Sequence, residues 1–144
     1  MSESVSFEEY LSRYGTLTYT NKGVSMEPLL HQGRDLFTVA KKGPERCRAG
    51  DVVLFRRGKD YVLHRIVEVL PEGYVCLGDN SVYPERGVTD EDILGVLTGF
   101  VRKGKEHSVT EGPYRAYSAL MLNARGLRVL CTRALMKGKR LLTR

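Results

Sequence analysis

The sequence has few cysteines, and their pattern excludes two classes of small protein. The three cysteines make an odd count, and no Cys-x-x-Cys pair occurs among Cys47, Cys76 and Cys131. This pattern excludes a disulfide framework and a typical zinc site, and it predicts free thiols in a reducing compartment. The three histidines also lack metal-ligand spacing. We therefore expect no metal and no cofactor.

Long apolar runs are also missing. No stretch approaches the roughly 18 uninterrupted apolar residues that indicate a transmembrane helix. The first residues, 1–5, lack the basic start and apolar core of a secretory signal. From these two absences we expect a protein that is cytoplasmic or peripheral at the membrane, with no signal peptide and no transmembrane helix.

Acidic residues are absent from residues 112–144, where eight basic residues occur. Subtracting these eight from the formal net charge of +6 leaves −2 for residues 1–111. Apolar residues from Tyr117 to Leu135 recur on one side at helical spacing, and basic residues gather on another. This predicts a domain over 1–111 and a basic amphipathic helical tail over 112–144. The apolar side could contact an anionic membrane through residues 113–144, or it could pack on the rest of the protein.

The first 111 residues alternate between short elements and turns. Ser6 followed by Glu9 has the spacing of a capping box, and Gly15 is a helix stop, so we expect a short helix between Ser6 and Gly15. Runs rich in Val, Ile, Leu, Phe and Tyr follow, separated by turn residues, and each predicts a strand. These runs are Thr16–Thr20, Asp35–Lys41, Asp51–Arg56, Tyr61–Leu70, Gly73–Leu77 and Ile93–Arg102.

The hydrophobic fraction of 42% and the charged fraction of 28% are ordinary for a globular protein. A chain of 144 residues is long enough to bury a core. The predicted fold is mainly β: a bent, partly closed β-barrel with a short N-terminal helix and a C-terminal amphipathic helix.

Two segments carry the residues of a nucleophilic site. Ser25 lies in a tight loop that Pro28 terminates, which would leave its hydroxyl exposed and held in place. His64 lies in the alternating run Tyr61–Leu70 that predicts a strand, and sheet pairing could bring it back to Ser25. A free serine is a poor nucleophile at neutral pH, so it needs such a base. The pair suggests a serine peptidase.

The order of four motifs supports this interpretation. Ser25-Met26-x-Pro28, then Gly50–Phe55, then His64-Arg65-Ile66, then Gly78-Asp79-Asn80 resemble the signature boxes of the signal peptidase I family. Most bacterial members have lysine where this chain has His64, so the chain resembles the archaeal and endoplasmic-reticulum branch, which uses a Ser-His pair. The resemblance implies a barrel of the signal peptidase type over residues 1–111, without the usual transmembrane anchor.

The resemblance also implies a role for each site residue. Ser25 would be the nucleophile, His64 the general base, and Asp79 an assisting acid that accepts the second imidazole N–H. Glu85 is the nearest counterpart of a second acid. Gly23 replaces a serine that donates to the oxyanion in many bacterial members. Losing one such donor costs about 2.7–4 kcal/mol in other proteases, so we expect a slow enzyme or another donor.

The motif also includes Met26 and Pro28, which we expect to shape the loop and the wall of the substrate cleft. Each motif residue has a simpler explanation: Ser25 could be a turn serine, His64 a half-buried structural histidine, and Asp79 the residue of a tight turn. We prefer the functional interpretation because the motifs occur together and in order.

The predicted activity is that of a serine endopeptidase that cleaves a peptide or pre-protein, which would be its main partner. Self-cleaving SOS-repressor relatives share the fold and the nucleophile loop, but they use lysine as the base and carry a DNA-binding domain. Only 24 residues precede Ser25 here. The alternative is a non-enzymatic β-barrel binding module whose basic tail binds an anionic membrane or nucleic acid. The tail has no recognised nucleic-acid-binding motif, so nucleic acid is the weaker form of this alternative.

Overall fold

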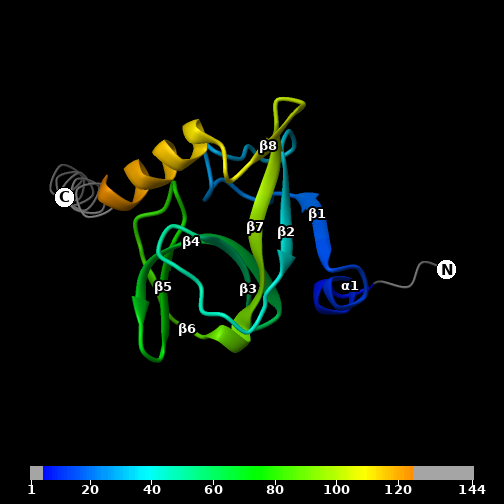
Figure 1. The fold of residues 1–144 in the computed structure, drawn as a ribbon, viewed down its shortest axis with the longest axis vertical. Helices are drawn as coiled ribbons and strands as arrows, with labels where there is room; N and C mark the ends of the chain where they lie inside the picture. The colour runs from blue at the N-terminus through cyan, green and yellow to red at the C-terminus, as the bar shows by residue number, and fades with distance from the viewer. Residues whose placement is uncertain (1–4, 125–144) are drawn as a thin grey trace, which may run out of the picture.

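A computed structural model describes residues 5–124, which form one antiparallel sheet with a helix before it and a helix after it (Figure 1). A 3-10 turn, η1, precedes the longest strand of the second half of the chain. The elements are α1 (Phe7–Tyr14), β1 (Thr16–Thr20), β2 (Leu36–Lys41), β3 (Val52–Arg57), β4 (Asp60–Leu70), β5 (Gly73–Leu77), β6 (Glu85–Val88), η1 (Asp90–Asp92), β7 (Ile93–Arg102), β8 (Lys105–Ser108) and the C-terminal helix, described over 112–124.

The sheet has eight strands in the order β1-β2-β7-β3-β4-β5-β6, and β8 pairs with β7. All six predicted strands are present, and their bounds differ from the prediction by at most one residue. The sequence did not reveal β6 and β8. Each has only four residues, and both are rich in polar or glycine residues.

The sheet is open. Within residues 5–124, β1 pairs only with β2 and β6 pairs only with β5, so the two edges do not meet. The mainly β fold between two helices is therefore confirmed, but the sheet is not closed into a barrel. In β4, pairing with β5 begins at Arg65, so among the described residues Asp60–His64 have a strand partner only in β3.

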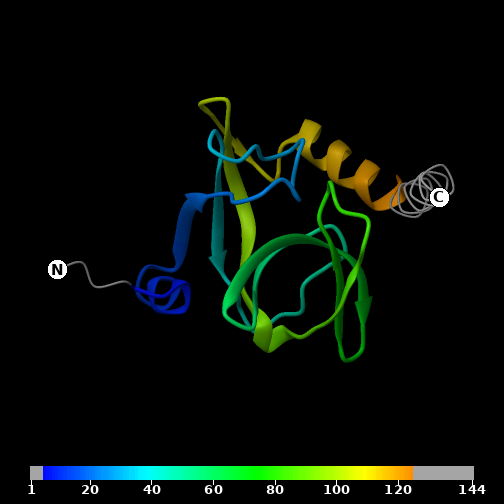
Figure 2. The same cartoon turned by 180° about the vertical axis from the view of Figure 1, so that it is seen from behind.

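The sheet bends around two apolar clusters, and β3 contributes to both. Val52 and Leu54 belong to the larger cluster, which also holds Leu11 of α1 and Met26. Val53 and Phe55 face the second cluster, on the side where β4 and β5 curl round in Figure 2. Alternate residues of a strand point to opposite faces, so a strand covered on both sides is buried throughout. This rigid centre fixes the position of β4.

The N-terminal helix begins and ends as the sequence predicts. The Ser6 hydroxyl accepts a hydrogen bond from the backbone N–H of Glu9 at 3.1 Å. Gly15 adopts φ +79°, a conformation that favours glycine, and its N–H bonds the carbonyl of Leu11. Leu11 enters the core, and Phe7 stacks on Tyr61 of β4 with ring centroids 4.5 Å apart. Helix α1 is thereby fixed beside the start of β4.

The described part of the C-terminal helix packs against the sheet. Tyr114 belongs to the larger apolar cluster, Tyr117 packs on it, and Leu122 packs on a smaller cluster of β4 and β5 residues. For this part, the packing alternative of the sequence analysis is the one observed. Leu120 points outward and is 59% exposed. The predicted tail from 125 to 144 lies outside the described residues.

Candidate active site

The loop between β1 and β2 holds Ser25 in a fixed turn. Gly23 has φ +77°, and its N–H donates to the side-chain oxygen of Gln32 at 2.9 Å. Met26 is fully buried, and its carbonyl accepts from the N–H of Leu30 at 3.0 Å. The buried Met26 side chain therefore anchors the turn, while Ser25 stays half-buried at the rim of a cavity.

The strand β4 brings His64 to this serine. The Nε2 atom of His64 lies 3.3 Å from the Oγ atom of Ser25, within hydrogen-bond distance. Val53 of β3 is the register partner of His64, so the pairing of β3 with β4 fixes the position of His64 along the sheet. The structure therefore brings together the two residues that the sequence predicts as nucleophile and base.

A third segment, the loop after β5, locks this pair in place. The backbone N–H of Asn80 donates to the carbonyl of Ser25 at 2.8 Å, and its side-chain amide donates to the carbonyl of Val24 at 3.1 Å. A Cβ atom at Gly78 would lie 2.6 Å from the Ser25 carbonyl oxygen and 3.1 Å from Nε2 of His64. Only glycine allows this close approach of three segments. The Gly-Asp-Asn motif thus contributes through Gly78 and Asn80 as well as through its acid.

Burial determines the charge state of His64. The pKa of His64 is lowered to about 4: desolvation is the largest cause, the positive charge of Arg57 also lowers the pKa, and the negative charge of Asp79 opposes both. The imidazole is therefore neutral at pH 7, so one of its nitrogens can accept a proton. Its Nδ1 atom is buried and has no hydrogen-bond partner within residues 5–124.

The predicted hydrogen bond from His64 Nδ1 to Asp79 is consequently not formed. The guanidinium of Arg65 binds Asp79 in a two-pronged pair, Nε to Oδ1 and Nη2 to Oδ2, both at 2.8 Å. The hydroxyl of Tyr117, from the C-terminal helix, also donates to Oδ2, at 2.7 Å. Because both carboxylate oxygens already accept such charge-assisted bonds, Asp79 acts on His64 through its charge.

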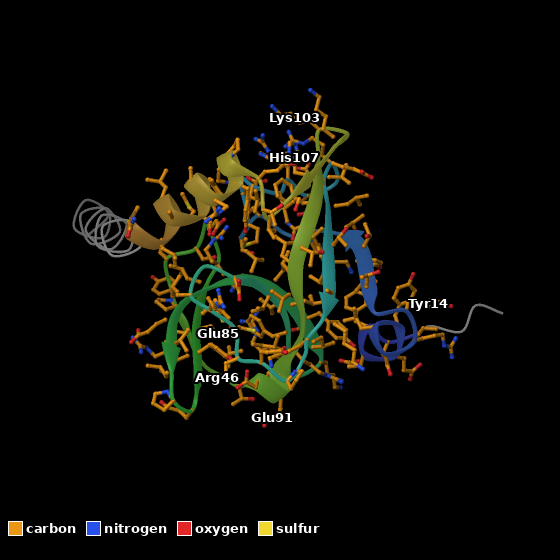
Figure 3. All side chains as sticks on the ribbon, in the orientation of Figure 1. Tyr14, Arg46, Glu85, Glu91, Lys103 and His107 are labelled. Atoms are coloured by element: carbon orange, nitrogen blue, oxygen red, sulfur yellow. The ribbon has the colours of Figure 1, made fainter. Side chains whose placement is uncertain are left out.

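The possible second acid, Glu85, forms a pair with a different residue. Its carboxylate accepts from Arg57 at 2.8 Å, and its register partner is Cys76 of β5. Figure 3 shows Glu85 in the same half of the molecule as Arg46, away from the end where His107 lies. Glu85 therefore reaches the site through Arg57, whose charge acts on His64.

The two residues predicted to shape the substrate cleft lie elsewhere. Met26 is in the core, and Pro28 lines a separate hollow of about 260 Å³ beside the C-terminal helix. The cavity that holds Ser25 and His64 has a volume of about 750 Å³. Its walls come from the end of β1 (19–22) and the start of β4 (61–64), with Phe7 of α1 and Ser81 beside them.

Several residues of the site were not found from the sequence. Ser81 directly follows the Gly-Asp-Asn motif, and this position was the available signal. Arg57 is the last residue of β3, and nothing in the sequence around it indicates that its charge acts on His64. Tyr117 was assigned to an apolar stripe, and no local pattern connects it with Asp79, because the contact joins residues 38 apart in the sequence.

Cys47 and Cys76 are buried free thiols, while Cys131 lies outside the described residues. Within residues 5–124, no group of three His, Cys, Asp or Glu side chains could hold a metal ion. No helix in this part of the chain is both long and apolar enough to cross a membrane. No known family model matches the chain, and no curated protein has a significantly similar sequence.

Proposed function

We propose that this chain is a serine endopeptidase of the signal peptidase type, working through Ser25 and His64. The observation that carries the proposal is the 3.3 Å approach of Ser25 Oγ to His64 Nε2 at the wall of a large cavity. A neutral, buried imidazole beside a held serine hydroxyl is the arrangement that nucleophilic catalysis needs. The bent β sheet and the order of the four motifs support the same assignment.

The reaction follows from these atoms. Ser25 Oγ attacks the carbonyl carbon of the scissile bond while its proton passes to His64 Nε2. His64 returns that proton to the leaving amine as the C–N bond breaks. Water then attacks the acyl-serine, giving its proton to His64, and the acid product leaves as Ser25 recovers its hydrogen. The negative charge of Asp79 stabilises the imidazolium in both steps.

The oxyanion needs donors at this site. The backbone N–H of Ser25 is the first, since Gly23 offers no side-chain donor. Ser81 lines the same cavity, and we assign its hydroxyl as a second donor. Removing one such donor costs about 2.7–4 kcal/mol in other enzymes.

The substrate would enter as an added strand. Residues Asp60–His64 of β4 pair with β3 alone among the described residues, and β1 is an edge strand. The cavity lies between these two free edges. An extended peptide placed there would gain main-chain hydrogen bonds for affinity, with pockets for alternate side chains. From the family resemblance, small residues would precede the cut at the first and third positions.

Cleavage of a peptide library tests the proposal. Products identified by mass spectrometry give the cut site, and Ser25→Ala should lower the rate on the order of a thousand-fold or more. Ser108→Ala, which removes the hydroxyl of a half-buried serine on β8, is the matched control and should cleave at the wild-type rate. Equal cleavage by wild type and Ser25→Ala would exclude Ser25 as the nucleophile.

We also propose that the tail docks the enzyme on an anionic membrane. Seven of the eight basic residues of the tail lie between 125 and 144, and each is worth about 1 kcal/mol near such a surface. A version ending at Ala124 keeps the packing contacts of the described helix. It should lose the salt-sensitive binding to anionic vesicles that we expect of the full chain. If the full-length protein does not bind such vesicles at low salt, this proposal is contradicted.

A further inference from the structure

The acid of the candidate site lies in a buried cluster that the C-terminal helix completes. Arg65 is 1% exposed and Asp79 is 4% exposed. Besides Asp79, the guanidinium of Arg65 binds the Gly50 carbonyl at 2.9 Å and the Ser118 hydroxyl at 2.7 Å. A buried charge pair needs such additional partners to offset its desolvation. The helix supplies them from one face.

Two tyrosines of this helix approach the pair, and they do so differently. Tyr117 donates its hydroxyl proton to Oδ2 of Asp79 at 2.7 Å. The hydroxyl of Tyr114 instead accepts from Nη1 of Arg65 at 3.2 Å. Both rings lie near the guanidinium, with its carbon 5.6 Å from the Tyr117 centroid and 5.7 Å from that of Tyr114. The two residues are therefore alike in packing and differ in whether they touch the carboxylate.

The charge of Asp79 also acts on the base, His64. The Nδ1 atom of His64 is buried and has no hydrogen-bond partner among the described residues. The charged groups that act on His64 are Arg57 from β3 and Asp79 from the loop after β5. Arg65 from β4 and Tyr117 from the C-terminal helix bind Asp79, and the hydroxyl of Tyr114 binds Arg65.

We propose that Tyr117 is a positioning residue for the acid of the site: its hydroxyl holds the Asp79 carboxylate in the fork of Arg65, and the C-terminal helix thereby sets the proton affinity of His64. A hydrogen bond donated to Oδ2 draws part of the carboxylate charge away from the imidazole. It also occupies a lone pair that Nδ1–H of His64 would otherwise use. The role of Tyr117 in catalysis rests on the proposed function, but its electrostatic effect on His64 does not.

Removing the Tyr117 hydroxyl should make the field of Asp79 at His64 more negative, which favours the imidazolium. The pKa of His64 should therefore rise from about 4 in Tyr117→Phe, by roughly half a unit to one unit. The pH at which cleavage reaches half its plateau should rise with it. A merely structural role for Tyr117 would change stability and leave both values in place.

The experiment is an NMR titration of the histidine ring Cε1–H signals, with His64 assigned by comparison with His64→Gln. Tyr114→Phe is the matched control, because it removes the same atom from the same helix without touching Asp79. In an Asp79→Asn background, Tyr117→Phe should leave the pKa of His64 unchanged, since the charge that it modulates is gone. Asp79→Asn alone should lower that pKa, which tests the account even if Tyr117→Phe does not fold.

Peptide cleavage by the same variants separates this inference from the proposed function. A rise in the pKa of His64 in Tyr117→Phe that is absent from Tyr114→Phe supports the positioning role, even if no variant cleaves any peptide. The positioning role is overturned if the pKa of His64 is the same in the two tyrosine variants, or if that pKa does not fall in Asp79→Asn. Cleavage that depends on Ser25 would then still support the proposed function.

Discussion

Two neighbouring residues of β4, His64 and Arg65, have opposite surroundings. Arg65 is buried, and its hydrogen bonds to Asp79, Gly50, Tyr114 and Ser118 are at most 3.2 Å long. His64 faces an open cavity, its Nε2 atom lies 3.3 Å from Oγ of Ser25, and its Nδ1 atom has no hydrogen-bond partner in the described part of the chain. Adjacent residues of a strand point to opposite faces, so one strand can serve both environments.

The difference indicates that the surroundings of Arg65 contribute to stability and that those of His64 favour reactivity. A buried polar atom without a partner costs free energy, and such atoms are rare in folded proteins. Arg65 and Asp79 form a saturated cluster that joins β4, the loop after β5 and the C-terminal helix. His64 keeps an unsatisfied atom and a lowered pKa, which are features of functional sites. We call the Arg65–Asp79 cluster the saturated side and the His64–Ser25 pair the reactive side. The contacts of the saturated side hold the reactive side in position.

The largest expected effect is the loss of the saturated side. Arg65→Met would leave Asp79 as a buried carboxylate without its cation, and breaking such a pair typically costs about 3–5 kcal/mol. Arg57→Met is the matched control, because the Arg57 side chain is 57% exposed and pairs with Glu85 at the surface. It should cost about 1 kcal/mol or less. Urea unfolding of both variants measures this, and similar losses would remove the distinction between the two sides.

A smaller effect is expected where the two sides meet. Gly78→Ala would push a methyl group against the Ser25 carbonyl and His64, and such overpacking costs about 1–3 kcal/mol. Displacement of the serine should also lower cleavage by about a hundred-fold. Gly112→Ala, at a glycine with open space around it, should change neither property. Wild-type cleavage by Gly78→Ala would show that the close approach does not position the pair.

The smallest effect concerns the reactive side alone. Because His64 accepts a proton only when neutral, cleavage should rise as the pH increases through about 4 and remain level through neutral pH. Removing the positive charge in Arg57→Met should favour the imidazolium, so this inflection should move to higher pH. A pH–rate profile checks the direction. An inflection that stays in place or falls would mean that Arg57 does not act on the base.

The same shift has a consequence for stability. The pKa of His64 is lower in the folded protein than the usual 6.5, so the unfolded chain binds more protons between these two values. Folding is therefore weakened as the pH falls from about 6.5 towards 4. His64→Gln should lessen this acid sensitivity, because glutamine does not titrate. Thermal unfolding of both proteins at pH 7 and pH 5 measures the difference.

Much of the reactive side could be predicted from the sequence, because its evidence is local. The turn residues around Ser25 and the alternating run that contains His64 carry their signals within a few positions. The strand bounds followed for the same reason: apolar alternation and turn residues fix them. The short strands β6 and β8 were not predicted, because they bury few side chains and form only by pairing with their neighbours.

The saturated side could not be predicted, because it depends on contacts between distant segments. Asp79 meets Arg65 and Tyr117 only after the sheet and the C-terminal helix have come together. Met26 shows the same limit, since its motif suggested a cleft wall and the fold placed the side chain in the core. Periodicity identified Tyr117 as an inward-facing residue and could not identify what it would touch.

The central claim is that Ser25 is an activated nucleophile, and covalent labelling tests it most directly. A fluorophosphonate probe is added to the full chain, and the modified residue is identified by peptide mapping. The account predicts one adduct, on Ser25, formed faster as the pH rises through the titration of His64 and absent from His64→Gln. An adduct on another residue, or none on Ser25 at neutral pH, would contradict it.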